Sequence, residues 1–490
     1  MNLLDAITDG ALLGGAFAGP TWAPWRTFVK VIDALPLSAD DRQLFEQCTG
    51  RTVPPSRRVT EVYAIVGRRG GKSRLAAALA IEAACLVDWS PYLAVGERPV
   101  VACVAADRQA GVVMNYVRGL LLATPLLAQT IVRETDSVIE LANGVSIEVT
   151  TCSARTTRGY SFCTVVADEL AFWRSESSSE PDVEVLAAVR PGMSTLPGAR
   201  LVCISSPYAR SGALWQAYKT HHGRDDDPVL TWVAPSLTMN PSLDPAVVAA
   251  AYERDPASAG AEFGAQFRVD VEGFVSREVL DACVVPGRLS LPRLRDHEYV
   301  AFVDPSGGSQ DSFTVAVAHA EREAGQVIAV LDAVEERRPP FSPEAVVREF
   351  AETVKRYGCH LVTGDRYAGE WPREQFRKHG VEYVPSEKPK SDLYRETLPM
   401  FSSGRVRLLD LPRLIMQLLN LERRTARGGK DSIDHAPHAH DDVANAAAGA
   451  LVTAAGGATN DFEVLSANVN PERNRRVLDD GEMQWMRRIV

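Results

Sequence analysis

Apolar residues in the first half of the chain alternate between short runs and helix-spaced stretches. Residues 62–66 form an apolar run, and residues 74–87 are alanine-rich with apolar positions at helical spacing. A second apolar run at 100–106 also precedes a helical stretch. Strands that alternate with helices are typical of a parallel α/β sheet. The segment 138–150 predicts a hairpin instead, because two alternating strands flank Asn143-Gly144.

A different pattern begins near residue 299. Three strand-like runs at 299–303, 313–319 and 327–334 are followed by helix, strand, helix, strand and helix. This order predicts a ribonuclease-H-like fold. Between the two halves, short alanine-rich helices broken by Pro245 and Pro256 predict a connector.

Composition adds limits on compartment and partners. The 490-residue chain has no run of 18 apolar residues and no basic-then-apolar leader, so we expect a cytoplasmic protein without membrane contact. Its eight dispersed cysteines predict buried free thiols. The net charge is −10, yet residues 386–430 hold ten Lys or Arg against five acids. A basic face for nucleic acid is therefore compatible with an acidic chain.

The run Gly67 to Ser73 reads Gly-Arg-Arg-Gly-Gly-Lys-Ser and lies between a predicted strand and helix. In such a loop the backbone N–H groups face the phosphates of ATP, the lysine neutralises them, and the serine hydroxyl binds Mg²⁺. The common pattern has glycine at position 66, where this chain has Val66. A glycine-rich turn with a basic tip is the alternative. The predicted ATP-binding residues are Gly67, Arg68, Arg69, Gly70, Gly71, Lys72, Ser73 and Asp168.

Acidic and small polar residues end two later strands. Asp168 and Glu169 follow an apolar run, where the first would hold Mg²⁺ and the second would polarise the attacking water. Acids at strand ends are also common without such a role. Ser205 and Ser206 end the next strand and are expected to sense the γ-phosphate, with an ordinary strand-to-turn transition as the alternative. Arg158 is a candidate arginine finger or a solvated loop residue.

In the second half, carboxylates mark the predicted sheet edge. Asp304 and Asp365 end strands, and Asp441 and Asp442 open the last helix. In a ribonuclease-H-like fold these acids converge and would hold two Mg²⁺ or Mn²⁺ ions that cleave a phosphodiester. The sequence leaves open which of the last two binds directly. Each acid alone is more typical of a cap or turn, and it is the three positions in this order that favour a metal site. The candidate DNA contacts are Arg423, Arg424, Arg427 and Lys430.

Taken in order, six motifs make the chain resemble the large terminase subunit of tailed double-stranded DNA bacteriophages. They are Gly-Arg-Arg-Gly-Gly-Lys-Ser, Val-Val-Ala-Asp-Glu, Ile-Ser-Ser-Pro, Val-Asp-Pro-Ser-Gly-Gly, Thr-Gly-Asp and His-Asp-Asp-Val-Ala-Asn. The resemblance implies an ATPase that moves double-stranded DNA into a procapsid and a nuclease that cuts concatemers. It also implies a ring, commonly a pentamer, on the portal protein, a small terminase subunit as partner, and action in the host cell cytoplasm. Arg68 matches the family's catalytic loop arginine, and Ser205-Ser206 match its coupling motif.

The predicted architecture is α/β throughout, with a P-loop domain of the ASCE type and a ribonuclease-H-like domain. We assign residues 1–55 to a helical or lid segment, 56–220 to the ATPase, 221–295 to a connector, 296–455 to the nuclease and 456–490 to a tail. Two other functions fit the motifs. A helicase-nuclease of repair or recombination would need strand-separation motifs that we do not find, and a non-hydrolysing ATP-dependent DNA clamp would have less need of Glu169.

Overall fold

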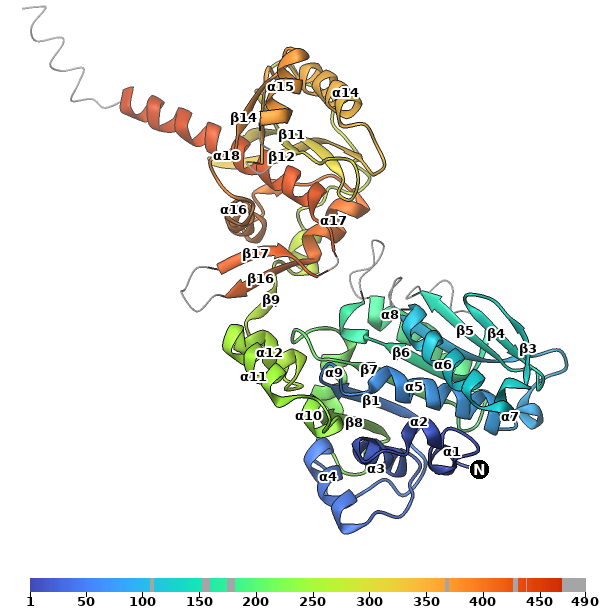
Figure 1. Ribbon diagram of the computed structural model, residues 1–490. Helices are drawn as coiled ribbons and strands as arrows, with labels where there is room; N and C mark the ends of the chain where they lie inside the picture. The colour runs from blue at the N-terminus through green and yellow to red at the C-terminus, as the bar shows by residue number, and fades with distance from the viewer. Residues whose placement is uncertain are drawn as a thin grey trace, which may run out of the picture. The chain divides into compact units, whose positions relative to one another are not determined.

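The computed structural model describes residues 1–105, 110–151, 159–173, 181–365, 370–425, 431–437 and 439–468. The chain divides into two compact units, Met1–Glu272 and Gly273–Val490 (Figure 1). Each unit has its own main sheet with a hydrophobic core on either face. Both units are α/β, as the strand and helix patterns predict.

The main sheet of the first unit is mostly parallel, and among its described strands only the β3–β4 and β4–β5 pairs are antiparallel. Strand β7 lies between β1 and β6, which is the ASCE arrangement. The carboxyl ends of these three parallel strands therefore share one edge of the sheet. In spatial order the strands are β3 (Ile131–Glu134), β4 (Val138–Leu141), β5 (Ser146–Thr151), β2 (Pro99–Ala105), β6 (Ser161–Asp168), β7 (Arg200–Ser205), β1 (Glu61–Val66) and β8 (Val229–Ala234).

Alternate residues of the central strands enter different cores. Val62, Ala64 and Val66 pack with α5, α6 and the N-terminal helices, whereas Tyr63 and Ile65 pack with α8 and α9. Parallel strands covered on both faces read as continuous apolar runs, which is the pattern that marked them in the sequence. The helices are α1 (Leu3–Thr8), α2 (Gly14–Phe17), η1 (Pro20–Trp22), α3 (Ala23–Ile32), α4 (Ala39–Thr49), α5 (Lys72–Ile81), η2 (Glu82–Leu86), η3 (Ser90–Tyr92), α6 (Ala110–Ala123), α7 (Pro125–Ala128), η4 (Leu170–Phe172), α8 (Pro181–Met193), α9 (Gly212–His221), α10 (Ser236–Met239), α11 (Pro245–Arg254) and α12 (Pro256–Glu262).

Strand β8 is an element that the sequence analysis does not predict. It lies within the segment assigned to the connector, yet it pairs in parallel with β1 along the whole of that strand. Its flanks explain the omission, since an acidic turn precedes it and Pro235 follows it. The short strand β9 (Val271–Gly273) lies at the division between the units.

The second unit has the predicted order of three antiparallel strands followed by parallel additions. The sheet order is β14 (Glu382–Pro385), β13 (Leu361–Gly364), β10 (Tyr299–Asp304), β11 (Phe313–Glu323), β12 (Gln326–Arg337) and β15 (Val406–Arg407). Strand β13 pairs in parallel with β10, so Asp304 and Asp365 follow neighbouring strand ends. A separate hairpin consists of β16 (Leu421–Thr425) and β17 (Asp431–His435). The six-stranded sheet, with β10, β11 and β12 antiparallel and β13 and β14 added in parallel, has the ribonuclease-H-like arrangement.

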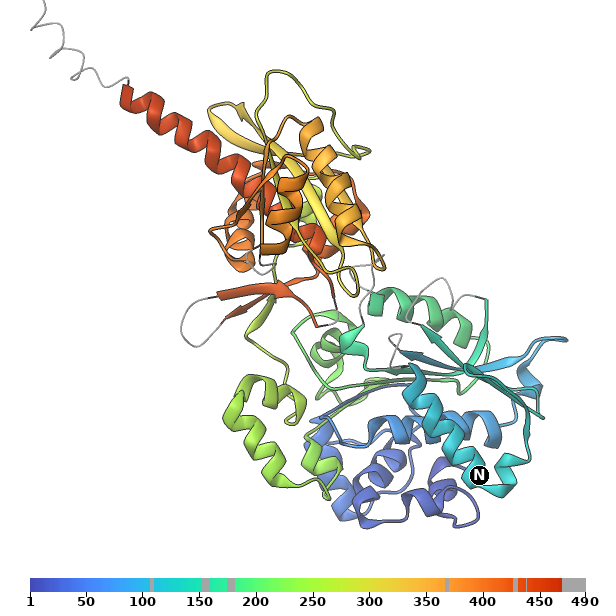
Figure 2. The ribbon, with the colours of Figure 1, turned by 45° about the horizontal axis from the view of Figure 1, so that its top comes forward.

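Helix α18 runs across one face of this sheet (Figure 2). A side chain at Gly449 would meet the Phe302 ring at 2.4 Å, so glycine permits the close approach of α18 to β10. The helix continues to Asn468 through part of the predicted tail, and residues 469–490 lie outside the described part of the chain. The helices of this unit are α13 (Arg277–Asp281), α14 (Pro343–Arg356), α15 (Glu370–Lys378), α16 (Lys390–Ser402), α17 (Pro412–Leu419) and α18 (Asp442–Asn468).

The described cysteines are free thiols, six of them buried, and Cys152 lies outside the described residues. Among the helices that the structure describes, none is both long enough and apolar enough to cross a membrane.

Candidate active sites

The glycine-rich loop joins β1 to α5 at the carboxyl edge of the first sheet. Gly71 has φ of +93°, a conformation that glycine adopts without the steric cost of a side chain. A Cβ at Gly70 would lie 2.6 Å from the Val66 side chain. Both positions therefore require glycine, and the loop passes closely over the strand end as a phosphate-binding loop does.

Residues far away in the sequence hold this loop in place. The Trp25 indole donates to the Gly70 carbonyl at 2.7 Å. The Ser236 hydroxyl donates to the Arg68 carbonyl at 2.6 Å, and the Asn240 amide donates to the Arg69 carbonyl at 2.8 Å. A cavity of about 260 Å³ lies beside Gly70 and Gly71. Sequence reasoning missed these supports because no local pattern connects them to the loop.

Lys72 connects the loop to the ends of β6 and β7. It is buried, and its ammonium donates to the Val66 carbonyl at 2.9 Å and to the Ser206 hydroxyl at 3.0 Å. Its Nζ lies 3.7 Å from Oε1 of Glu169. Burial lowers the pKa of Lys72, although the acids Glu169 and Asp168 oppose this shift.

Glu169 is held by the residues predicted to couple hydrolysis to movement. The Ser205 hydroxyl lies 3.4 Å from its Oε2, and the Ser206 backbone N–H donates to the same oxygen at 3.3 Å. Glu169 also has φ of +51°, which is uncommon for a residue with a side chain and is typical of strained functional positions. The structure thus brings Lys72, Glu169, Ser205 and Ser206 into one contact network.

Asp168 and Ser73 meet beside this network, and their donor set fits Mg²⁺. The Ser73 hydroxyl lies 3.5 Å from Oδ2 of Asp168. Asp168 is 3% exposed, and its buried Oδ1 has no hydrogen-bond partner among the described residues. Burial, and then the charge of Glu169, raise the pKa of Asp168 to about 7. A hydroxyl and a carboxylate with a spare oxygen are the hard ligands that Mg²⁺ prefers.

The three arginines predicted for the ATP site do not join this contact network in the described part of the chain. Arg68 is largely exposed, and its guanidinium lies 3.0 Å from the Glu262 carboxylate on α12. Arg69 adopts a left-handed conformation with φ of +62°. Arg158 lies outside the described residues.

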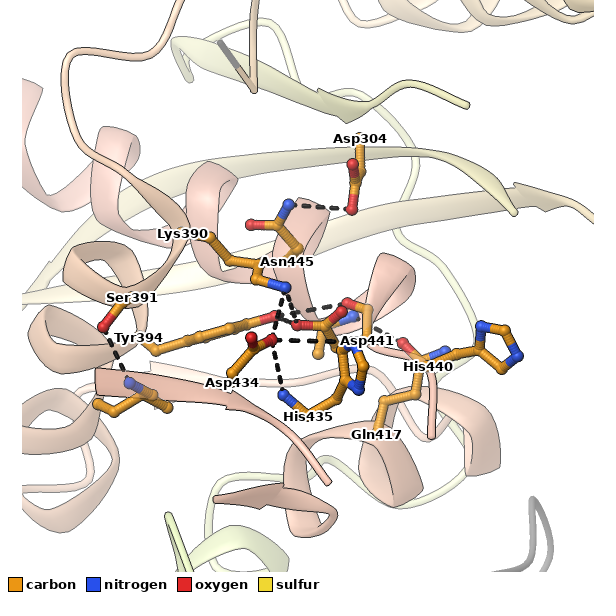
Figure 3. Close-up of polar contacts among 12 residues, drawn as sticks. Asp304, Lys390, Ser391, Tyr394, Gln417, Asp434, His435, His440, Asp441 and Asn445 are labelled. Atoms are coloured by element: carbon orange, nitrogen blue, oxygen red, sulfur yellow. Dashed lines mark hydrogen bonds and ion pairs between the residues drawn. The ribbon is translucent and has the colours of Figure 1, made fainter. Parts of the chain in front are cut away.

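In the second unit, all four predicted acids line one cavity of about 1040 Å³. Asp304 ends β10, Asp365 follows β13, and Asp441 and Asp442 lie at the start of α18. Gln417 fixes that helix start, because its side-chain oxygen accepts from the backbone N–H groups of Val443 and Ala444 at 2.8 and 3.0 Å. Asn445 donates to Oδ2 of Asp304 at 2.9 Å and so ties the helix to the strand (Figure 3).

The adjacent residues Asp441 and Asp442 have different surroundings. Oδ2 of Asp441 accepts from the Tyr394 hydroxyl at 2.9 Å and lies 2.9 Å from Nζ of Lys390 (Figure 3). Oδ2 of Asp442 is buried and has no hydrogen-bond partner among the described residues. Sequence reasoning missed Lys390 and Tyr394, which lie on α16 about fifty residues before α18.

Burial and mutual repulsion raise the pKa values of two of the cavity acids. Burial raises the pKa of Asp304 well above its usual range, and Asp442, Asp441 and Asp365 add to this rise. Burial and Asp441 raise the pKa of Asp442 to about 6. Crowded carboxylates around a cavity, one with a spare buried oxygen, fit divalent cations with oxygen ligands such as Mg²⁺ or Mn²⁺.

The predicted DNA-contact residues are only partly described. Arg423 and Arg424 lie in β16, where Arg423 donates to Asp431 at 2.6 Å and Arg424 donates to Glu422 at 3.3 Å. Arg427 and Lys430 lie outside the described residues. Their expected contact with DNA stays a prediction.

Comparisons with solved structures find large terminases. The chain is 18% identical to the large terminase of bacteriophage HK97, covering 80% of this chain and 91% of that one, with a TM-score of 0.35. It is 12% identical to the large terminase of a thermophilic bacteriophage in complex with ADP, covering 85% and 99%, with a TM-score of 0.35. The large terminase nuclease of the thermophilic phage G20c with bound magnesium is 18% identical, covering 36% and 94%, with a TM-score of 0.29.

No family model and no curated protein matches the chain. Because the structural likenesses have low identities and low TM-scores, the function proposed below depends on the chain's own residues.

Proposed function

We propose that this chain is a viral DNA-packaging motor that hydrolyses ATP to move double-stranded DNA into a procapsid and cuts concatemeric DNA with a two-metal nuclease. The observation that carries the proposal is the pairing of two sites in one chain. In the first unit, Lys72 of the phosphate loop contacts Glu169 and Ser206, and Ser205 contacts Glu169. Four carboxylates line one cavity in the second.

In the first site, the loop amides and Lys72 bind the phosphates of ATP. Ser73 and Asp168 would hold Mg²⁺, which offsets phosphate charge when bound. Glu169 orients the attacking water and accepts its proton. In the described structure Glu169 faces Lys72 instead, so entry of the γ-phosphate would compete for the lysine and free the carboxylate. Arg68 would assist by turning from Glu262 toward the phosphates.

Ser205 and Ser206 would carry the result of hydrolysis into the sheet. Ser206 contacts Lys72 through its hydroxyl and Glu169 through its backbone, so it touches both groups that respond to the γ-phosphate. Ser205 also accepts from the Ala171 backbone N–H at 3.2 Å, which links it to η4 after the acidic strand. Loss of phosphate would therefore change contacts on β7 and on the segment after β6 together.

In the second site, we propose that Asp304, Asp365 and Asp442 hold the metal ions directly. The ions activate water and stabilise the leaving oxygen when bound. Asp442 has the spare buried oxygen that a ligand needs. Asp441 is already occupied by Lys390 and Tyr394, so it would position α18 and balance the lysine charge. Asn445 orients Asp304.

The partners follow from this function. The motor would act in the host cell cytoplasm as a homo-oligomeric ring, commonly a pentamer, on the portal protein of the procapsid. A small terminase subunit would select the DNA. The basic residues Arg423, Arg424, Arg427 and Lys430 are the proposed DNA contacts.

Two matched variants test the two sites separately. Glu169→Gln should abolish ATP hydrolysis and packaging while cleavage of plasmid DNA in Mn²⁺ continues. Asp304→Ala should stop cleavage and leave ATP hydrolysis largely intact. Undiminished ATP turnover in Glu169→Gln would reject the first assignment, and persistent cutting in Asp304→Ala would reject the second. Duplex unwinding by the wild-type protein would favour a helicase-nuclease, and ATP binding without turnover would favour a clamp.

A further inference from the structure

A second group of metal-ligating side chains lies in the second unit, outside the carboxylate cavity. His297, His319 and Glu321 each offer a ligand atom, and these atoms lie within 4.8 Å of one another. Nε2 of His319 lies 3.1 Å from Oε1 of Glu321, and Nε2 of His297 lies 3.8 Å from the same oxygen. Ligands bound to zinc at about 2.0–2.1 Å in a tetrahedral arrangement are separated by roughly 3.3 Å, so the spacing suits that ion.

The sheet places these three residues together. Tyr299 pairs with His319 across the β10–β11 ladder, and continuing this antiparallel register outward would set residue 297 opposite residue 321. Residues two apart in a strand share a face, so all three side chains lie on one side of the sheet. Six-residue β10 separates this cluster from Asp304 by roughly 16 Å at about 3.3 Å per step, so the two sites are distinct.

His319 has the partner that orients a metal ligand. Its Nδ1 lies 2.7 Å from Oδ2 of Asp332, and the side chains of His319 and Asp332 are 2% and 1% exposed. A carboxylate bound to one imidazole nitrogen fixes the tautomer and leaves the lone pair of the other nitrogen free for a metal. Here that other nitrogen faces Glu321.

At this distance, either a proton on Nε2 of His319 or a metal ion lies between the nitrogen and the Glu321 oxygen. A proton shared between His319 and Glu321 would satisfy that pair. It would not explain why His297 packs edge-on against His319, with ring centroids 4.6 Å apart and its Nε2 directed to the same carboxylate. The buried Nδ1 of His297 has no hydrogen-bond partner among the described residues. One ion bound to Nε2 of both histidines and to the Glu321 carboxylate accounts for the convergence of the three side chains, although not for the unpartnered Nδ1 of His297.

We propose that His297, His319 and Glu321 form a zinc site. The ion would connect the segment just before β10 to strand β11 of the β11–β12 hairpin. Two imidazoles and one carboxylate favour a borderline ion such as Zn²⁺ over Mg²⁺. Glu321 is 38% exposed at its side chain, and His297 is 26% exposed, so the ion can enter from solvent. The site stabilises the fold of the second unit and takes no part in DNA cleavage.

The test uses the full chain, from which metal is first removed with a chelator. The protein is then loaded with Zn²⁺ in the presence of excess Mg²⁺, which occupies the oxygen-ligand sites, and is desalted. Metal content is measured for the parent, His297→Ala, Glu321→Gln and the control His379→Ala, a histidine that directly follows α15 and is not part of the cluster. We expect the parent and the control to retain one more zinc ion per chain than the other two variants. Equal zinc content in the parent and in His297→Ala would overturn the proposal.

Thermal melting gives a second readout that a misfolded variant cannot imitate. Zn²⁺ should raise the Tm of the parent and of His379→Ala by at least about 3 °C, because a ligand that binds only the folded state stabilises it. The Tm of His297→Ala should not respond to Zn²⁺. The same zinc-dependent rise in His297→Ala would show that the ion binds elsewhere.

Discussion

Replacing Asp441 and Asp442 one at a time by asparagine tests which of these adjacent residues binds metal. Asparagine keeps the size of the side chain and removes its charge. Asp441 has two donors on Oδ2, the Lys390 ammonium and the Tyr394 hydroxyl, each at 2.9 Å. Oδ2 of Asp442 has no partner among the described residues. The two substitutions are therefore expected to differ in both activity and stability.

For Asp442→Asn we expect a loss of DNA cleavage of about 1,000-fold or more, since a directly bound carboxylate contributes several kcal/mol to a metal site. In the absence of metal, the free energy of unfolding of Asp442→Asn should equal or exceed that of the parent, because the change removes a buried acid whose Oδ2 has no described partner. For Asp441→Asn we expect a smaller loss, about 10- to 100-fold, as is usual for residues that orient a ligand. Its stability should fall by about 1–3 kcal/mol, since a charge-assisted hydrogen bond is lost.

That stability cost is limited by the remaining contacts. Tyr394 can still donate to the asparagine oxygen, and Lys390 keeps Asp434 at 2.7 Å. The assays are plasmid cleavage in Mn²⁺ over a metal titration and urea unfolding in chelator. The reasoning is refuted if Asp441→Asn loses more cleavage than Asp442→Asn, or if Asp442→Asn is the less stable of the two without metal.

Two other substitutions test the support of the first site and of the N-terminal helices. Gly71→Ala should cost about 1–2 kcal/mol of stability, because an alanine at φ of +93° is strained and its Cβ would lie 2.9 Å from Trp25 Nε1. The affinity for ATP, measured by calorimetry, should weaken at least about tenfold. An unchanged affinity would contradict the assignment of this loop to ATP binding. Asp41→Asn should destabilise the fold by about 1–3 kcal/mol at pH 7. Burial alone would raise the pKa of Asp41, but hydrogen bonds from Lys30, Thr27 and Ser38 lower it overall. Its stabilisation is therefore present at neutral pH and is lost as the pH falls below about 4, so urea unfolding should show the gap between variant and parent closing there.

Local sequence was sufficient to predict the parts of each site that follow a strand. Apolar runs identified β1, β6 and β10, and the loop and acids after them were recognisable because parallel strands end at functional edges. The order of elements from β10 to α16 also followed from periodicity, whereas β15, α17, β16 and β17 before the last helix were not predicted. Strand β8 was not predicted, since an acidic turn and a proline frame a short run whose burial depends on pairing with β1.

Contacts between residues distant in the chain were decided only by the tertiary structure. The insertion of β7 between β1 and β6 places Ser206 against both Lys72 and Glu169, although these three residues come from separate segments. The packing of α16 beside α18 gives Asp441 its two donors, whereas Oδ2 of Asp442 has none among the described residues. The sequence by itself determined which residue types end the strands, because hydrophobic periodicity and turn chemistry are local. Strand order and helix packing decided which of those residues touch, because they bring together side chains that no local pattern relates.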